Sequence, residues 1–132
     1  MGERRLDIRG RDLNPYGHVN SAIYATYLEE CRNALIVELL DGIGNAGDFA
    51  LARLAIDYRR ELTTADGSVV VRCFVERVGT ASVTFREEIR TASGDLAAEG
   101  EAVIVAHDHG TGRSRPVTGH ERAAFETAGA ET

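Results

Sequence analysis

Hydrophobic and polar residues alternate along this chain with two different periods, and the change of period marks the predicted elements. Residues 21–40 show the three- and four-residue spacing of an amphipathic helix, with apolar side chains at Tyr24, Leu28, Cys31, Leu35 and Leu39. Ahead of this stretch, Leu6 and Ile8 alternate with charged neighbours, which predicts a short strand over residues 4–9. One short strand therefore precedes the only long helix.

An alternation of period two covers most of the chain after the helix. It predicts four strands, over residues 49–63, 69–78, 82–91 and 96–106. Asp66-Gly67, Gly79 and Ser93-Gly94 separate them by short turns, so we expect the four strands to be antiparallel neighbours or nearly so. A short terminal helix is predicted over residues 118–128. The pattern favours an α+β protein in which a curved five-stranded antiparallel sheet wraps one long helix, the only element expected to cover it.

Composition places the chain among ordinary globular proteins. Its 132 residues suit one domain, residues 1–132, and the 43% hydrophobic and 27% charged residues are typical of a folded chain. The start resembles no signal peptide, and no apolar run approaches the roughly 20 residues that span a bilayer. Cys31 and Cys73 lie on predicted core elements and indicate no disulfide framework. We therefore expect a cytoplasmic protein that does not act in a membrane.

The charge balance narrows the class of partner. A formal net charge of −6 without a basic stripe argues against nucleic acid, whose phosphates require clustered cations. Local pairs of arginines, at Arg59-Arg60 and at Arg113 with Arg115, are candidates for the phosphates of a small ligand. Simple solvation of these arginines is the favoured interpretation.

The loop at residues 12–21 is the main candidate for chemistry. Pro15 fixes one φ angle and Gly17 bends freely, while Asn20 suits the N-cap of the helix. The first amides after this cap, those of Ser21 and Ala22, have no partner within the helix and lie at the positive end of its dipole. Such amides can stabilise a developing oxyanion, although most helix N-termini bind only water.

Two other patterns are discounted. Gly42, Gly44 and Gly47 match the spacing of a dinucleotide-binding loop, but a helix precedes them and a strand follows, so a helix-ending loop is favoured. The adjacent residues of His107-Asp108-His109 cannot all converge on one metal ion, and no fourth ligand is apparent. Neither a metal nor a cofactor is expected.

The first third of the chain combines loop and helix residues in one motif: Asp12-x-Asn14-x-x-Gly17-His18-Val19-Asn20, then Tyr24, Tyr27-Leu28-Glu29 and Arg32. This motif resembles the signature of hotdog-fold acyl thioesterases of the 4-hydroxybenzoyl-CoA thioesterase family. The resemblance implies the hotdog fold and a hydrolase that needs no cofactor. It also implies a homodimer or homotetramer whose active sites lie between protomers.

The resemblance assigns roles within the motif. The backbone amide of Ser21 would polarise the carbonyl of an acyl thioester, carried by coenzyme A or by an acyl carrier protein. Asn14 stands where the family usually has a carboxylate that attacks or activates water, and an amide can do neither. The predicted substrate-binding residues are Asp12, Gly17, His18, Tyr24 and Arg59. Structural alternatives are an Asx-type turn for Asp12, packing beside the helix start for His18, and a core position for Tyr24.

The amide at position 14 leaves three interpretations of catalysis. In the first, Asn14 holds the water or substrate while Arg32 contributes charge, as in the branch of the fold that serves enediyne and polyketide biosynthesis. In the second, Glu29 is the base or nucleophile, as in a related branch with a glutamate about two turns along the helix. In the third, the domain is a non-catalytic acyl-binding module.

Distance limits the role of Arg32. It lies eleven residues beyond Ser21, about 16 Å along a helix, so it would act on another part of the ligand or across a dimer. The alternative for Arg32 is an ion pair with Glu29, three residues earlier. A hotdog dehydratase is disfavoured, because His18 lies in Gly-His-Val-Asn and not in the Gly-His-Phe-Pro of that family.

Overall fold

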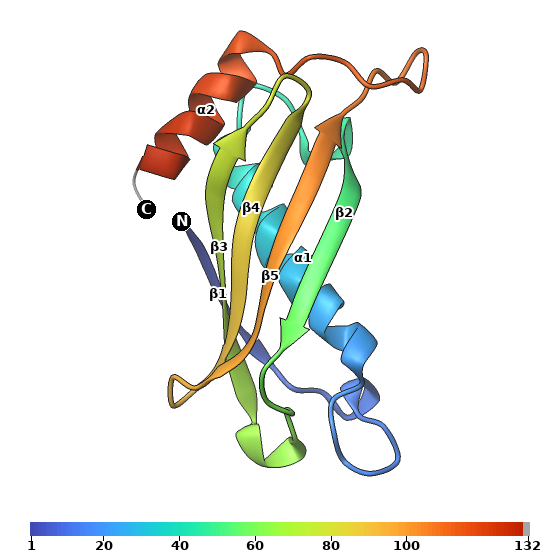
Figure 1. Ribbon diagram of the computed structural model, residues 1–132, viewed down its shortest axis with the longest axis vertical. Coiled ribbons are helices and arrows are strands. Elements are labelled where there is room, and N and C mark those ends of the chain that lie inside the picture. The colour runs from blue at the N-terminus through green and yellow to red at the C-terminus, as the bar shows by residue number, and fades with distance from the viewer. Residues whose placement is uncertain (131–132) are drawn as a thin grey trace.

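The computed structural model describes residues 1–130, so the last two residues of the predicted domain lie outside it. Its long helix is α1 (Ser21–Leu39), and α2 (Gly119–Ala130) closes the described chain. Five strands form one antiparallel sheet in the order β1-β3-β4-β5-β2 (Figure 1). The strands are β1 (Gly2–Asp7), β2 (Phe49–Tyr58), β3 (Ser68–Val78), β4 (Ser82–Thr91) and β5 (Leu96–Ala106).

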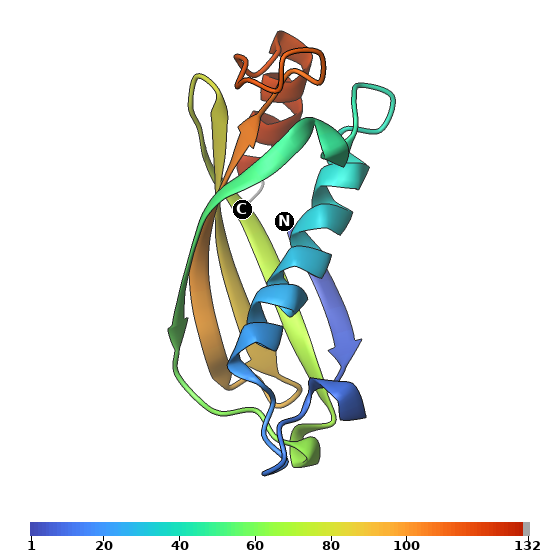
Figure 2. The same cartoon turned by 90° about the vertical axis from the view of Figure 1, so that its right-hand side faces the viewer.

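Helix α1 runs along the concave face of the curved sheet (Figure 2). The apolar stripe predicted for it is buried except at Leu39, which is partly buried, and Tyr27 and Leu28 are fully enclosed. On the facing strand β5, a Cβ added to Gly100 would lie 2.8 Å from the Ala55 carbonyl oxygen and 3.5 Å from Leu28 Cδ1. Only the contact with Ala55 O is too close, so glycine at this position allows the backbones of β2 and β5 to approach each other. The predicted α+β hotdog fold is confirmed.

The position of β2 differs from the expectation. The last four strands were expected to be antiparallel neighbours or nearly so. All four are antiparallel in one sheet, but β2 pairs with β5, and β3 lies between β1 and β4. The predicted strand also ends at Tyr58 and not at residue 63, since the N–H groups of Arg59 and Arg60 both donate to Ala97 O. The segment 59–67 instead connects the edge strand β2 to β3 across the end of the sheet, and it passes the N-terminus of α1 (Figure 2).

Helix α2 corrects a second expectation. The sequence indicated that α1 alone covers the sheet, but α2 packs on the sheet near β3 (Figure 1). Phe125 of α2 is fully buried, and its ring meets those of Phe49 and Phe85 edge-on, at centroid distances of 5.6 and 6.2 Å. The hydroxyl of Thr118 accepts from the N–H of Glu121 and caps this helix, close to the start predicted at residue 118.

The two cysteines are buried free thiols, on α1 and β3, as the hydrophobic pattern predicted. Burial raises the pKa of Cys31 to about 11, so this thiol stays protonated at neutral pH. No helix within residues 1–130 combines the length and apolar character needed to cross a bilayer.

Candidate functional site

The loop before α1 is built around the side chain of Asn14. Its Oδ1 accepts from the N–H groups of Tyr16 at 2.9 Å and His18 at 3.1 Å, and its own N–H donates to His18 O at 2.7 Å. Gly17 supplies the left-handed turn, with φ of +79°, that folds the loop back on itself. Asn14 is therefore first a loop-forming residue, because internal bonds occupy its carbonyl oxygen.

The start of α1 leaves one backbone amide without a partner. Asn20 is the predicted N-cap, and its side chain accepts from the N–H of Ala22 at 3.1 Å. The N–H of Ala22, which has no partner within the helix, is therefore satisfied by the predicted cap. Within residues 1–130, nothing accepts from the N–H of Ser21, which lies at the positive end of the helix dipole.

This free amide belongs to a residue that lines a hollow of about 560 Å³ at one end of the molecule. The hollow has apolar and polar walls from the loop, from α1 and from the end of β2. Its lining residues are Asn14, Val19, Asn20, Ser21, Tyr24, Tyr58, Arg59, Arg60 and Glu61. Four of the predicted site residues, Asn14, Ser21, Tyr24 and Arg59, thus meet at one place.

Two tyrosines tie the walls of this hollow together. The hydroxyl of buried Tyr24 accepts from Leu62 N–H at 2.9 Å and donates to Arg60 O at 3.3 Å. The hydroxyl of Tyr58 donates to Ser21 O at 3.0 Å, and the two rings meet edge-on at 5.0 Å. Tyr24 therefore fixes the segment after β2 against the first turn of α1.

Asp12 and Gly17 support the site without lining this hollow. Asp12 is 2% exposed, and its Oδ2 accepts from Tyr27 Oη at 2.7 Å and from Arg9 N–H at 2.9 Å. Its own carbonyl accepts from the N–H of Asn20. Asp12 thus joins the loop to α1, whereas the expected alternative was an Asx-type turn. Burial alone would raise the pKa of Asp12, but the bonds from Arg9 and Tyr27 outweigh burial and lower it.

The lowered pKa of Asp12 predicts a loss of stability in acid. A carboxyl that ionises more readily in the folded chain stabilises it above the unfolded pKa, about 3.9, and this contribution disappears as the pH falls further. In urea titrations, Asp12→Asn should lower the free energy of unfolding by about 1–3 kcal/mol at pH 7. The difference from wild type should shrink below about pH 4. A difference that does not change with pH would contradict the assignment.

The side chain of His18 contacts Glu61, a residue that sequence reasoning did not single out. Its Nδ1 lies 2.9 Å from Glu61 Oε2, and its backbone forms a bridge with Thr63. Glu61 lines the hollow, but His18 does not. The period-two pattern placed residues 59–63 in a strand. Nothing in the sequence therefore indicated that the chain brings Tyr58, Arg60 and Glu61 to the start of α1, apart from their position beside Arg59.

Glu29 and Arg32 lie in a different hollow, of about 310 Å³, farther along α1 beside the start of β2. Arg32 is buried, and its Nη1 donates to both carboxylate oxygens of Glu87, at 2.8 and 2.9 Å. The alternative considered for Arg32, an ion pair with Glu29, is therefore replaced by a pair with Glu87. Burial raises the pKa of Glu87, while the charge of Arg32 and the thiol of Cys73, which donates to Glu87, oppose that rise.

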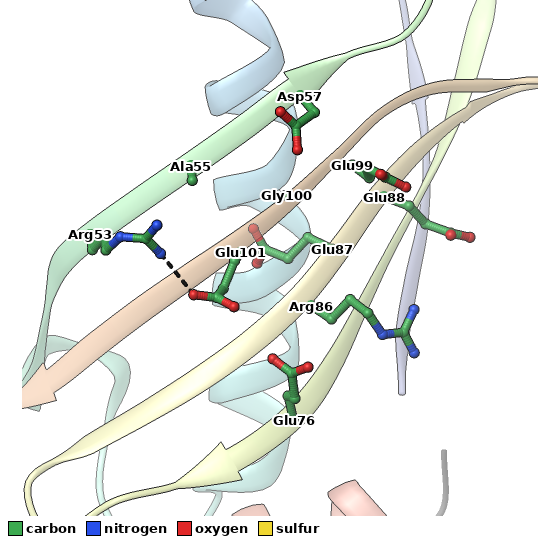
Figure 3. A pocket seen from close by; sticks show the side chains of 10 residues that line it. All are labelled: Arg53, Ala55, Asp57, Glu76, Arg86, Glu87, Glu88, Glu99, Gly100 and Glu101. Atoms are coloured by element: carbon green, nitrogen blue, oxygen red, sulfur yellow. Dashed lines mark hydrogen bonds and ion pairs between the residues drawn. The ribbon is translucent and has the colours of Figure 1, made fainter.

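A third hollow, of about 410 Å³, lies on the face of the sheet that is turned away from α1 (Figure 3). Charged side chains surround it, and one pair, Arg53 and Glu101, is joined at 2.7 Å. Glu87 belongs to the other face, since it is buried and bonded to Arg32 on α1. The charged walls suit an acyl chain poorly, and the start of α1 lies elsewhere. The hollow at Ser21 is therefore the better candidate.

The two discounted patterns have structural roles. Gly42, with φ of +75°, lies just beyond the C-cap of α1 at Leu40, in the helix-ending loop that was predicted. His109 Nε2 lies 2.8 Å from Asp48 Oδ1, and its ring meets that of His107 edge-on. Among residues 1–130, no three His, Cys, Asp or Glu side chains form a group suited to a metal ion.

Comparison with known families agrees with this fold. The model of the thioesterase superfamily matches residues 16–98, and the chain belongs to that superfamily. It is similar to a thioesterase from Thermus thermophilus, complexed with coenzyme A and Zn, with 27% identity over 98% of this chain and 94% of that one, and a TM-score of 0.83. No curated protein matches the sequence.

Two further solved structures have the same fold. The PA2801 protein from Pseudomonas aeruginosa is 30% identical over 93% of this chain and 96% of that one, with a TM-score of 0.80. A DHNA-CoA thioesterase from Staphylococcus aureus is 18% identical over 98% and 91%, with a TM-score of 0.84. The last likeness concerns the fold alone. Membership of the superfamily does not distinguish its branches, so the enediyne and polyketide branch stays a prediction.

Proposed function

We propose that this protein hydrolyses an acyl-CoA thioester whose carbonyl oxygen accepts a hydrogen bond from the backbone N–H of Ser21. The unpartnered amide at the start of α1, in a residue that lines a hollow, is the observation that supports this proposal. A donor already oriented at the positive end of a helix stabilises the oxyanion that forms when water attacks the carbonyl. The hydroxyl of Ser21 has no role in this step.

Coenzyme A is the proposed carrier of the acyl group. The relative from Thermus thermophilus is a thioesterase complexed with coenzyme A. Arg59 and Arg60 line the same hollow as Ser21 and can meet phosphates, once released from Glu99 and Asp66. An acidic carrier protein would have to approach a chain with a net charge of −6. Acyl carrier protein, the substrate carrier of the polyketide branch, is therefore the second candidate.

The remaining predicted catalytic residues take separate roles in this proposal. Asn14 shapes the loop and lines the hollow, where it orients the substrate and does not attack it. Glu29 lies eight residues beyond Ser21, about 12 Å along α1, and Arg32 lies farther still. Glu29 would contact a distant part of the acyl group, or reach the carbonyl only from a partner protomer, whereas Arg32 is buried and paired with Glu87.

We also propose a homodimer in which two copies of β2 pair. Strands β1 and β2 are the two edges of the sheet, and β1 carries the charges of Glu3, Arg4 and Arg5. Strand β2 is longer and mostly apolar, and its Leu51 and Tyr58 are 46% and 51% exposed. A long apolar edge favours pairing with another strand. Because Tyr58 lines the hollow, a partner on β2 would complete the wall of the site.

The proposed interface predicts that a charge added to edge strand β2 disrupts the dimer, whereas a charge change on edge strand β1 does not. Leu51→Glu should shift the protein from dimer to monomer and lower thioesterase activity, since it places a carboxylate in the β2 pair. The matched control, Arg5→Glu on the exposed β1 edge, should stay dimeric. Light scattering after size-exclusion chromatography measures both. A wild-type monomer, or dissociation only by Arg5→Glu, would contradict the β2 dimer.

Release of free thiol from a panel of acyl-CoA and acyl-carrier thioesters tests the proposed activity. The proposal expects release from acyl-CoA well above the rate without protein. Binding of acyl-CoA without release for any chain length would favour the non-catalytic acyl-binding module. Formation of an enoyl thioester from a 3-hydroxyacyl thioester would favour the dehydratase. Glu76→Gln, an exposed change on the opposite face of the sheet, is the control expected to match wild type.

A further inference from the structure

We propose that Glu61 supplies the carboxylate that position 14 lacks, and that His18 holds it in place. This inference rests on the proposed hydrolysis and names the group that activates the water. Within the described part of the chain, Glu61 is the only carboxylate among the residues that line the hollow at Ser21. An ionised carboxylate that borders the same hollow as the polarising amide can accept a proton from water that attacks the bound carbonyl.

The segment that carries Glu61 is fixed on both sides of it. The Tyr24 hydroxyl, from the first turn of α1, donates to Arg60 O and accepts from Leu62 N–H. Val19 N–H donates to the carbonyl of Leu62, which is fully buried. The backbone of Glu61 is thus tied to the same loop and helix turn that present the amide of Ser21. This connection fixes the position of the Glu61 backbone relative to the amide of Ser21.

The side chain of Glu61 is held by His18. Its Oε2 lies 2.9 Å from His18 Nδ1, while Glu61 itself is 74% exposed at the hollow. His18 does not line the hollow, so it acts through Glu61 as a positioning residue. With Nδ1 protonated, the imidazole donates to Oε2 and leaves Oε1 without that bond. The pair resembles the histidine and carboxylate of many hydrolytic sites, with the carboxylate here nearer the substrate.

The proposed step balances within the site. The water oxygen forms a bond to the carbonyl carbon, and its proton passes to the Glu61 carboxylate. The oxyanion formed from the carbonyl oxygen accepts from Ser21 N–H. When the tetrahedral intermediate collapses, the C–S bond breaks, and protonated Glu61 returns the proton to the departing thiolate. The products are a carboxylic acid and free coenzyme A, so no co-reactant other than water is needed.

Variants of Glu61 test the proposal in the full-length protein with an acyl-CoA that wild type hydrolyses. Glu61→Gln should lower kcat at least about 100-fold with little change in KM, because it keeps the shape but cannot take a proton. Added formate should restore part of the activity of Glu61→Ala, an effect that a purely structural role would not produce. The exposed side chain makes misfolding a poor explanation, and circular dichroism of each variant checks this.

His18 is tested by its conservative variant. His18→Asn keeps a side-chain N–H near the position of Nδ1 and should retain most of kcat, whereas His18→Ala should lose about tenfold. Glu61→Gln with kcat within about threefold of wild type would overturn the proposal, as would complete loss of activity in Glu29→Gln with Glu61→Gln active. Hydrolysis undetectable in wild type itself would instead refute the proposed function, and this inference with it.

Discussion

Replacing Glu87 by alanine is expected to lower the free energy of unfolding by about 3–5 kcal/mol. The change leaves the Arg32 guanidinium charged and buried without its carboxylate, and an unpaired buried charge is among the most costly core defects. Cys73 also loses the acceptor of its thiol. Urea unfolding followed by far-UV circular dichroism measures the loss.

An exposed ion pair between two strands of the sheet provides the control. Arg53 and Glu101 are 2.7 Å apart, close to the 2.8 Å of Arg32 and Glu87, but their side chains are 58% and 45% exposed. Glu101→Ala should therefore cost no more than about 1 kcal/mol. Replacing Arg32 and Glu87 together by methionine should recover much of the stability lost by Glu87→Ala. Equal losses in Glu87→Ala and Glu101→Ala would contradict a structural role for the buried pair.

The second large effect is expected at Ser21. Ser21→Pro removes the backbone N–H and should lower kcat/KM for acyl-CoA about 100- to 1000-fold, the usual effect of losing one oxyanion donor. The helix should survive, because proline is favoured at the first helical position. The preceding residue, Asn20, already has φ of −58° and ψ of 133°, a conformation that suits a residue before proline.

Two variants of the same residue separate the amide from other properties of Ser21. Ser21→Ala removes the hydroxyl but keeps the N–H, and should stay within a few-fold of wild type. Ser21→Val has bulk similar to proline and keeps the N–H, so it should retain much more activity than Ser21→Pro. If Ser21→Ala were as inactive as Ser21→Pro, the hydroxyl and not the amide would be responsible.

Local features of the fold were predictable from the sequence, but strand order was not. The bounds of β4 and β5 and the Asn20 cap follow from side-chain periodicity and local chemistry. The pairing of β2 with β5 depends on how the segment 59–67 crosses the sheet, which no local pattern records. The motif of residues 12–32 could be recognised in the sequence as a candidate site because that segment is continuous in the chain.

Partners distant in sequence explain what sequence reasoning missed at the site. Glu29, three residues earlier on the helix, was the alternative partner considered for Arg32, but the actual partner is Glu87, 55 residues away. Asp12 likewise bonds to Tyr27 on α1 rather than turning the loop alone. Glu61 reaches His18 only because the chain leaves β2 after Tyr58. Each contact depends on tertiary packing and not on spacing.

The central claim is that the N–H of Ser21 holds the carbonyl oxygen of an acyl thioester. An acyl-CoA analogue with a methylene group in place of the thioester sulfur keeps the carbonyl but cannot be hydrolysed. A crystal structure of the protein with this analogue tests the claim most directly. The account predicts the carbonyl oxygen about 2.7–3.1 Å from the backbone nitrogen of Ser21, in the hollow bordered by Glu61. A carbonyl bound instead beside Glu29 and Arg32, with Ser21 N–H facing only solvent, would contradict it.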